Sequence, residues 1–167
     1  MKRACHLLLG IGLVASSASF ALGPGDAAPA LRLASASGQT VELDKLRGKV
    51  VYVDFWASWC GPCKRSFPWM NDMLAKYRAQ GLEIVAVNVD RKREDAERFL
   101  AAAPAQFTVV YDASGSAPAA WQVKAMPTSY LIDANGTIAL VESGFRDERK
   151  GEVEDRIRAV LAAGPRK

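Results

Sequence analysis

The chain has 167 residues, of which half are hydrophobic, and its 22 basic and 18 acidic side chains give a formal net charge of +4. This length favours one domain, and the composition excludes an intrinsically disordered chain because it supplies ample apolar side chains for a core. The positive charge is too weak and too scattered to favour nucleic acid, so we expect no nucleic-acid partner.

Residues 1–21 show the three parts of a secretory signal peptide. Two basic residues stand near the start, an apolar run covers residues 4–15, and small side chains at Ser19 and Ala21 suit cleavage after Ala21. The run is shorter than the roughly 20 residues that cross a bilayer. We therefore expect export to the periplasm and a mature domain over residues 22–167, with an uncleaved anchor facing the periplasm as the alternative.

Two short segments then predict an N-terminal β extension. Polar and apolar residues alternate over residues 31–33 and again over residues 41–43. The connection between them, residues 34–40, is small and polar and contains Gly38, which favours a hairpin-like turn.

The most informative stretch runs from a strand through a turn into a helix. Residues 50–56 are apolar and rich in β-branched and aromatic side chains, except for Asp54. Such a run suits a central parallel strand covered by helices. Cys60 and Cys63 follow in Cys-x-x-Cys spacing, and apolar residues then recur every three or four positions, which predicts a helix over residues 60–80.

Three residues shape this predicted helix. We expect Gly61 to allow the tight turn, and Pro62 to fit the first helical turn, where its missing N–H leaves no hydrogen bond unmade. Pro68 lies further along the same helix and predicts a kink.

The position of the cysteines favours redox chemistry. A thiol at the start of a helix lies near unpaired N–H groups and the positive end of the dipole, which favour the thiolate. Lys64 and Arg65 add positive charge nearby. Because the thiolate is the nucleophile in thiol–disulfide exchange, we expect Cys60 to attack and Cys63, one turn deeper, to resolve.

Three other uses of the cysteine pair fit less well. Structural zinc takes four Cys or His ligands, whereas residues 22–167 contain two Cys and no His, so we expect no metal site. Haem attachment requires His directly after the second Cys, and here that residue is Lys64. A purely structural disulfide over so short a loop would stabilise the fold by only about 2 kcal/mol.

The remaining periodicity predicts strands that alternate with helices. The predicted strands cover residues 82–90, 107–111, 128–133 and 137–142, and the predicted helices cover residues 93–103, 117–123 and 148–162.

The stretch from Val53 to Lys64, VDFWASWCGPCK, resembles the active-site segment of the thioredoxin superfamily, most of all its secreted TlpA- and ResA-like branch. The resemblance covers residues 24–162. It implies an α/β, thioredoxin-like three-layer fold: a central mixed sheet with helices on both faces, an N-terminal β extension and an inserted helix–strand unit within residues 91–126.

The resemblance also implies a site for an extended client segment. Met126-Pro127 matches the cis-proline loop that faces the cysteines in this superfamily. The backbone of Met126 would pair with the client, as in β-augmentation. Trp59, Gly61 and Pro62 would complete this substrate-binding surface.

Asp54 is a lone carboxylate in an apolar strand, and burial there would raise its pKa. The resemblance implies that Asp54 accepts the proton of Cys63; a side chain turned to solvent or held in a salt bridge is the alternative. Two positions depart from the pattern. Ser66 replaces the glutamate of ResA-like proteins, and Ala86 replaces the lysine that couples to the buried aspartate of thioredoxin.

We therefore expect a monomeric periplasmic thiol–disulfide oxidoreductase that reduces client proteins through the Cys60–Cys63 pair, with no other cofactor. The resemblance implies clients such as apocytochrome c or a copper-site protein, and recharging by a membrane electron relay of the DsbD or CcdA type. The alternatives are a disulfide oxidant or isomerase, and a Cu(I)-binding module, since thiolates suit Cu(I).

Overall fold

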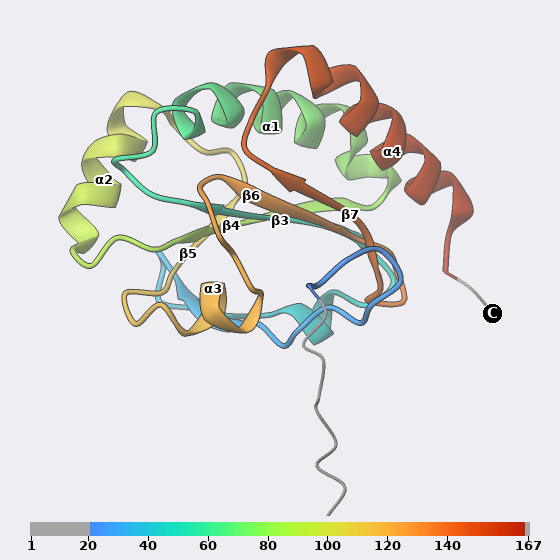
Figure 1. Ribbon diagram of the computed structural model, residues 1–167, viewed down its shortest axis with the longest axis horizontal. Helices are drawn as coiled ribbons and strands as arrows, with labels where there is room; N and C mark the ends of the chain where they lie inside the picture. The colour runs from blue at the N-terminus through green and yellow to red at the C-terminus, as the bar shows by residue number, and fades with distance from the viewer. Residues whose placement is uncertain (1–20, 166–167) are drawn as a thin grey trace, which may run out of the picture.

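The computed structural model describes residues 21–165, so nearly all of the predicted signal peptide lies outside the described residues. A seven-stranded mixed sheet forms the centre, in the strand order β2-β1-β5-β4-β3-β6-β7 (Figure 1). None of the helices within residues 21–165 is long and apolar enough to span a membrane.

The elements follow the predicted alternation along the chain. The strands are β1 (Arg32–Ser35), β2 (Thr40–Glu42), β3 (Val50–Trp56), β4 (Leu82–Asn88), β5 (Thr108–Tyr111), β6 (Thr128–Ile132) and β7 (Ile138–Ser143). The α-helices are α1 (Cys63–Tyr77), α2 (Arg93–Ala102), α3 (Ser116–Ala120) and α4 (Lys150–Ala163), and short 3-10 turns cover η1 (Leu43–Leu46), η2 (Arg78–Gln80) and η3 (Asp147–Arg149).

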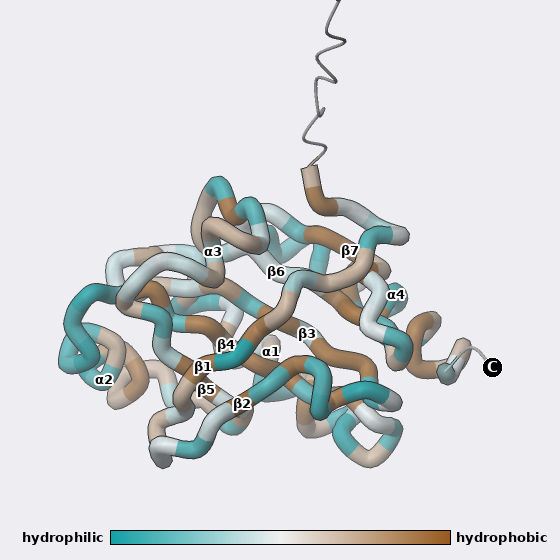
Figure 2. Tube along the Cα trace, turned by 90° about the horizontal axis from the view of Figure 1, so that it is seen from below, coloured by the Kyte–Doolittle hydropathy of each residue, from teal (hydrophilic) through white to brown (hydrophobic). Residues whose placement is uncertain are grey.

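Strand β3 lies in the middle of the sheet, as its apolar sequence predicted. It pairs in parallel with β4 and antiparallel with β6, and all seven of its residues are buried. Figure 2 shows a largely hydrophobic β3 segment, whereas the edge strand β2, Thr-Val-Glu, mixes hydrophilic and hydrophobic residues.

Two cores lie on the two faces of the sheet, which makes the predicted three layers. Helices α1, α2 and α4 cover one face, and α3 and η1 lie on the other (Figure 1). Side chains of β3 alternate between the two cores, with Tyr52 and Trp56 toward α1 and Val53 and Phe55 toward α3. The β1–β2 hairpin and the inserted α2–β5 unit complete the predicted thioredoxin-like fold.

The start of α1 differs from the prediction. The helix begins at Cys63, three residues later than expected, because the Cys60 N–H donates to the carbonyl of Ala57 in a turn. Gly61 has no positive φ angle, so this turn does not use its conformational freedom. Pro68 lies inside α1, which continues through it to Tyr77.

Two other helix ends also differ. Helix α1 ends at Tyr77 instead of residue 80, and the 3-10 turn η2 covers the next three residues. Gly81 then adopts the left-handed conformation that commonly ends a helix. Helix α3 ends at Ala120 instead of residue 123, and the next residue, Trp121, is fully buried among β3 and β6 side chains.

Candidate active site

Cys60 and Cys63 lie between the end of β3 and the start of α1, where a disulfide joins them with an S–S distance of 2.06 Å and a Cα–Cα distance of 5.4 Å. Both side chains are buried. The backbone N–H of Cys63 donates to Sγ of Cys60 over 3.3 Å. This contact is the helix-start donor that the sequence predicted, and it favours negative charge on the Cys60 sulfur.

Arg65, the second of the two basic residues after Cys63, contributes less than expected. Arg65 forms an ion pair with Asp147 at 3.5 Å, so its charge is already compensated. The backbone N–H groups of Lys64 and Arg65 donate to the carbonyls of Gly61 and Pro62 and are therefore not directed at the sulfur atoms.

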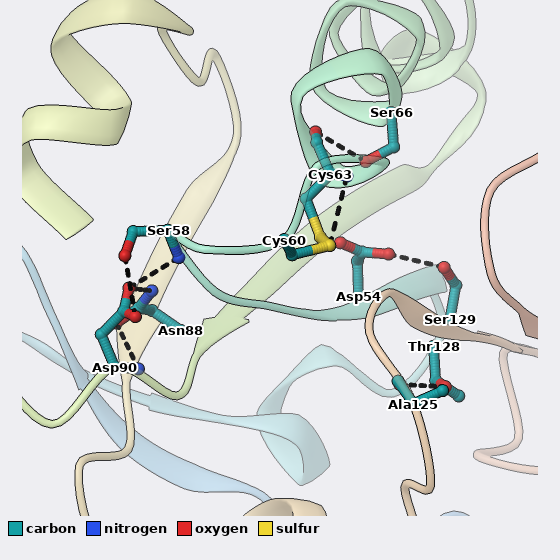
Figure 3. Close-up of a disulfide and its surroundings, with 10 residues drawn as sticks. All are labelled: Asp54, Ser58, Cys60, Cys63, Ser66, Asn88, Asp90, Ala125, Thr128 and Ser129. Atoms are coloured by element: carbon teal, nitrogen blue, oxygen red, sulfur yellow. Dashed lines mark hydrogen bonds between the residues drawn. A yellow bond between two sulfur atoms is a disulfide. The ribbon is translucent and has the colours of Figure 1, made fainter. Parts of the chain in front are cut away.

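A buried carboxylate that the sequence analysis missed holds the loop before Cys60. Asp90 accepts hydrogen bonds from the backbone N–H of Ser58 at 2.9 Å, from the Ser58 hydroxyl at 3.0 Å and from the Asn88 amide at 2.8 Å (Figure 3). Asn88 and Asp90 stand at the carboxyl end of the apolar strand β4. This position could have predicted that they lie near the cysteine loop, because the parallel strands β3 and β4 end at the same edge of the sheet.

Asp54 lies on the α1 face of β3, with 1% of its surface exposed. In Figure 3 its carboxylate lies between the disulfide and Ser129. Oδ1 accepts a hydrogen bond of 2.6 Å from the Ser129 hydroxyl, and Oδ2 is buried without a hydrogen-bond partner. Burial raises the pKa of Asp54 to about 7, and the Ser129 hydrogen bond partly opposes this rise. The alternative of a solvent-facing or salt-bridged aspartate is therefore wrong.

The surroundings of Asp54 and Cys63 show what stands in place of the lysine and the glutamate that the pattern contains. Ala86 on β4 lies directly beside Asp54, so no lysine balances the carboxylate from that strand. Ser129 on β6 lies on the other side and supplies the hydrogen bond instead. Ser66 is buried in α1, where its hydroxyl donates to the carbonyl of Cys63 at 3.1 Å. Ser129 was not predicted, because the pairing of β6 with β3 joins residues far apart in sequence.

The residues predicted to bind the client lie at one end of the sheet, because Thr128, which follows Pro127, pairs with Phe55 near the end of β3, and Trp59, Gly61 and Pro62 follow that strand. The Met126–Pro127 peptide bond is cis, as the resemblance predicted. Pro127 is buried and Met126 is half-buried, whereas Trp59 is 71% exposed. Within residues 21–165, Trp59 is the one large hydrophobic side chain that is exposed. Gly61 is exposed and Pro62 half-buried beside it.

A cavity of about 550 Å³ opens between α1 and α2 next to the cysteine loop. Its lining includes Ser58 and Lys64 from the active-site end and Phe99 and Pro104 from the inserted unit. Within residues 21–165, no group of three or more His, Cys, Asp or Glu side chains is arranged to hold a metal ion.

Comparisons with known proteins agree with this site. A family model described as the AhpC/TSA family matches residues 24–141. The thiol-disulfide oxidoreductase ResA of Bacillus subtilis (strain 168) is 34% identical over 146 residues, which cover 85% of this chain and 82% of that protein. ResA of Geobacillus kaustophilus is 36% identical over 124 residues, which cover 74% of this chain and 71% of that protein.

Solved structures share the fold. A Chlorobium tepidum protein assigned as thiol:disulfide interchange protein DsbE has 52% sequence identity and a TM-score of 0.82, over 84% of this chain and 99% of that one. The thioredoxin domain of a thiol-disulfide oxidoreductase from Bacteroides vulgatus has 25% identity and a TM-score of 0.74, over 82% and 99%.

The fold, the disulfide at the start of α1 and the cis-proline loop define a thioredoxin-fold protein built around a cysteine pair. The chain belongs to the AhpC/TSA family, and it is a thiol–disulfide oxidoreductase of the ResA and DsbE type.

Proposed function

We propose that the protein is an exported reductase that breaks disulfides in client proteins, with Cys60 as the nucleophile, Cys63 as the resolving thiol and Asp54 as the proton acceptor. The observation that carries the proposal is the buried, uncompensated carboxylate of Asp54 on the sheet face that α1 covers, with the Cys60–Cys63 pair at the start of that helix.

The reaction balances through two exchanges. The Cys60 thiolate attacks one sulfur of the client disulfide, a mixed disulfide forms, and the other client sulfur leaves as a thiolate. Asp54 then takes the proton of Cys63, and the Cys63 thiolate attacks Sγ of Cys60. The second client sulfur is released, the client has gained two electrons, and the enzyme is left with the disulfide seen here. An acid whose pKa is about 7 exchanges protons efficiently near neutral pH.

The residues at the cysteine end of the sheet support a role in binding the client. An extended client segment would lie across Trp59 and the Gly61-Pro62 turn and would pair with the backbone of Met126 beside Pro127. The exposure of Trp59 supports this, because the ring is free to pack against a partner.

The oxidised enzyme needs an electron source to act again. We propose a membrane electron relay of the DsbD or CcdA type, with the protein acting as a periplasmic monomer after cleavage of residues 1–21 and using no cofactor besides the cysteine pair. Apocytochrome c or a copper-site protein is the proposed class of client. The similarity to ResA and DsbE supports the thiol–disulfide chemistry on which these proposals rest.

The reduction potential of the Cys60–Cys63 pair tests the direction of the reaction. The Gly61-Pro62 dipeptide favours a potential nearer to the roughly −270 mV of thioredoxin than to the roughly −120 mV of DsbA. Equilibration with glutathione or dithiothreitol, followed by thiol alkylation and mass spectrometry, measures it. A potential above about −180 mV, the value of a disulfide isomerase, would favour the oxidant or isomerase instead. Stoichiometric Cu(I) binding by a protein that cannot reduce disulfides would favour the copper module.

A further inference from the structure

A row of polar side chains continues from Asp54 toward the β7 edge of the sheet. Asp54 on β3 lies opposite Ser129 on β6, and Ser129 lies opposite Glu142 on β7. Directly opposed residues of paired strands point to the same face. All three side chains are buried on the face that α1 and α4 cover, where the rest of the core is apolar.

Tyr52 joins this row from the same face of β3. Its side chain interacts with the Ser129 hydroxyl, while the Ser129 proton is directed at Asp54. A hydroxyl proton can rotate between acceptors, so once Asp54 is protonated the Ser129 hydroxyl can turn away from Asp54 and donate to the Tyr52 oxygen. Burial, together with the negative charges of Asp54 and Glu142, raises the pKa of Tyr52, so its phenol stays protonated.

The outer end of the row reaches the surface through charged groups. Glu142 forms ion pairs with Arg149 at 3.1 Å and with Arg146 at 3.5 Å. Tyr52, Glu142 and Arg149 line a small cavity of about 10 Å³, roughly the space that the centre of one water molecule needs. Its lining contains no residue of the 57–63 loop or of the Met126–Pro127 loop.

Asp54 is shielded from solvent, so a proton that it accepts needs a route out of the core. A proton taken from Cys63 has to leave Asp54 before the next turnover, and the influences on the pKa of Asp54 are burial, which raises it, and the Ser129 hydrogen bond, which opposes the rise. Its neighbours on the strands and on α1 are Tyr52, Ala86, Ser129 and Cys63. A client bound on Trp59 would cover the direct route past the cysteines.

We propose that Ser129, Tyr52 and Glu142 form a proton path from Asp54 to the β7–α4 edge, an inference that rests on the proposed role of Asp54 as the acceptor for Cys63. Protonated Asp54 donates to the Ser129 oxygen, and the Ser129 proton moves to the Tyr52 oxygen. The Tyr52 proton moves to water in the small cavity or to the Glu142 carboxylate. Each hydroxyl ends with one proton, so the net result is the transfer of one proton away from Asp54.

The test is the rate at which the mixed disulfide with insulin, a protein with accessible disulfides, is resolved in a single turnover. Tyr52→Phe removes one hydroxyl from the path and leaves the Ser129–Asp54 hydrogen bond in place. The rate should fall about tenfold, below the usual full effect of a proton-transfer group because water can partly substitute. The midpoint of the pH–rate profile should stay where it is. Glu142→Gln should slow resolution less than Tyr52→Phe, because cavity water can still accept the proton.

Tyr130→Phe is the matched control. Tyr130 is another buried tyrosine of the sheet; it lies on the α3 face, and its hydroxyl donates to the carbonyl of Trp121. Denaturant unfolding of both variants measures the structural cost of losing a buried hydroxyl. If Tyr52→Phe and Tyr130→Phe resolve the mixed disulfide at the same rate, the proton path is wrong, whatever their stabilities.

A second pair of variants tests the path if Tyr52→Phe does not fold. Ser129→Ala should slow resolution and move the pH midpoint upward, because the Ser129 hydrogen bond lowers the pKa of Asp54 and its removal raises that pKa. Ser129→Thr keeps a hydroxyl and should restore both. An unchanged rate in Ser129→Ala would overturn the path. If wild-type protein does not reduce insulin, the proposed function fails. If wild type is active and these variants resolve the mixed disulfide at the wild-type rate, the proton path alone fails.

Discussion

The two faces of the central sheet carry different kinds of residues, and β3 shows the difference within seven positions. Toward α1 it presents Tyr52, Asp54 and Trp56; toward α3 it presents Val51, Val53 and Phe55. The α1 face therefore combines a carboxylate and a disulfide with aromatic packing, while the α3 face of this strand is purely apolar. One strand thus separates redox chemistry from structural support, because successive side chains point to opposite faces.

The separation has an energetic cost on one face only. A buried carboxylate without a counter-charge destabilises the folded state when it is ionised. Phe55 meets no such conflict, since it packs against Trp121 and Tyr130 with ring centroids 5.6 and 6.1 Å apart. We therefore expect variants on the α1 face to change reactivity and stability together, and variants on the α3 face to change stability alone.

The largest effect is expected at the cysteines. Cys60→Ser removes the nucleophile and should abolish disulfide reduction. Cys63→Ser should keep the first exchange and accumulate a mixed disulfide with the client, since no thiol remains to resolve it. A non-reducing gel of protein recovered with bound clients distinguishes them. Accumulation in Cys60→Ser in place of Cys63→Ser would show that the two roles are reversed.

Phe55 and Phe67 allow a comparison of one aromatic side chain on each face of the sheet. Phe55→Ala and Phe67→Ala each empty a fully buried site, and each should cost about 3–5 kcal/mol of unfolding free energy. Phe67 lies in α1, four residues after Cys63, and packs against Trp56 of β3, so only the loss of Phe67 should also shift the reduction potential. Urea unfolding and redox equilibration of both variants check this. An equal shift of potential in Phe55→Ala would contradict the separation of the faces.

Much of this arrangement follows from local sequence. The apolar run 50–56, the Cys-x-x-Cys spacing and the helical periodicity predict the strand, turn and helix, since each pattern lies within one segment. The resemblance also predicted that Ala86 lies beside Asp54, because the two residues lie in adjacent, strongly apolar strands. Exact helix starts did not follow, since the Cys60 turn depends on a backbone hydrogen bond to Ala57.

The partners of Asp54 on the far side were not predictable in the same way. Ser129 and Glu142 reach the row only through the registers of β6 with β3 and β7, which sequence periodicity does not determine. From the sequence, Ser129 is indistinguishable from any other serine in a strand, and Glu142 is expected to be exposed near the end of a strand. Their burial and their alignment with Asp54 appear only when the sheet is assembled.

Asp54→Asn should stabilise the protein in a pH-dependent way. The folded pKa of Asp54, about 7, exceeds its ordinary value of 3.8, so wild-type stability falls as the pH rises from about 4 to 7. Asn carries no charge, and its advantage should grow over this range and level off above pH 7 at up to about 4 kcal/mol. Turnover should fall by about two orders of magnitude because the proton acceptor is lost.

Denaturant unfolding of the disulfide form at pH 5 and pH 8 measures the stability, and insulin reduction measures the rate. Asp72→Asn is the control, because Asp72 is an exposed carboxylate on α1. A stability gain that is the same at both pH values would mean that desolvation of Asp54 is not its cause.

The smallest effect concerns the two serines that flank the cysteine pair. The Ser58 hydroxyl donates to buried Asp90 at 3.0 Å, so Ser58→Ala should cost about 1 kcal/mol by weakening the support of the loop. The Ser66 hydroxyl donates to the Cys63 carbonyl within the first turns of α1. Ser66→Ala should be nearly neutral, because alanine favours the helix by about 0.5 kcal/mol and offsets the lost bond. Urea unfolding of both variants measures the difference. If Ser58→Ala were as neutral as Ser66→Ala, Asp90, which keeps its bonds from the Ser58 N–H and Asn88, would hold the loop without help from the Ser58 hydroxyl.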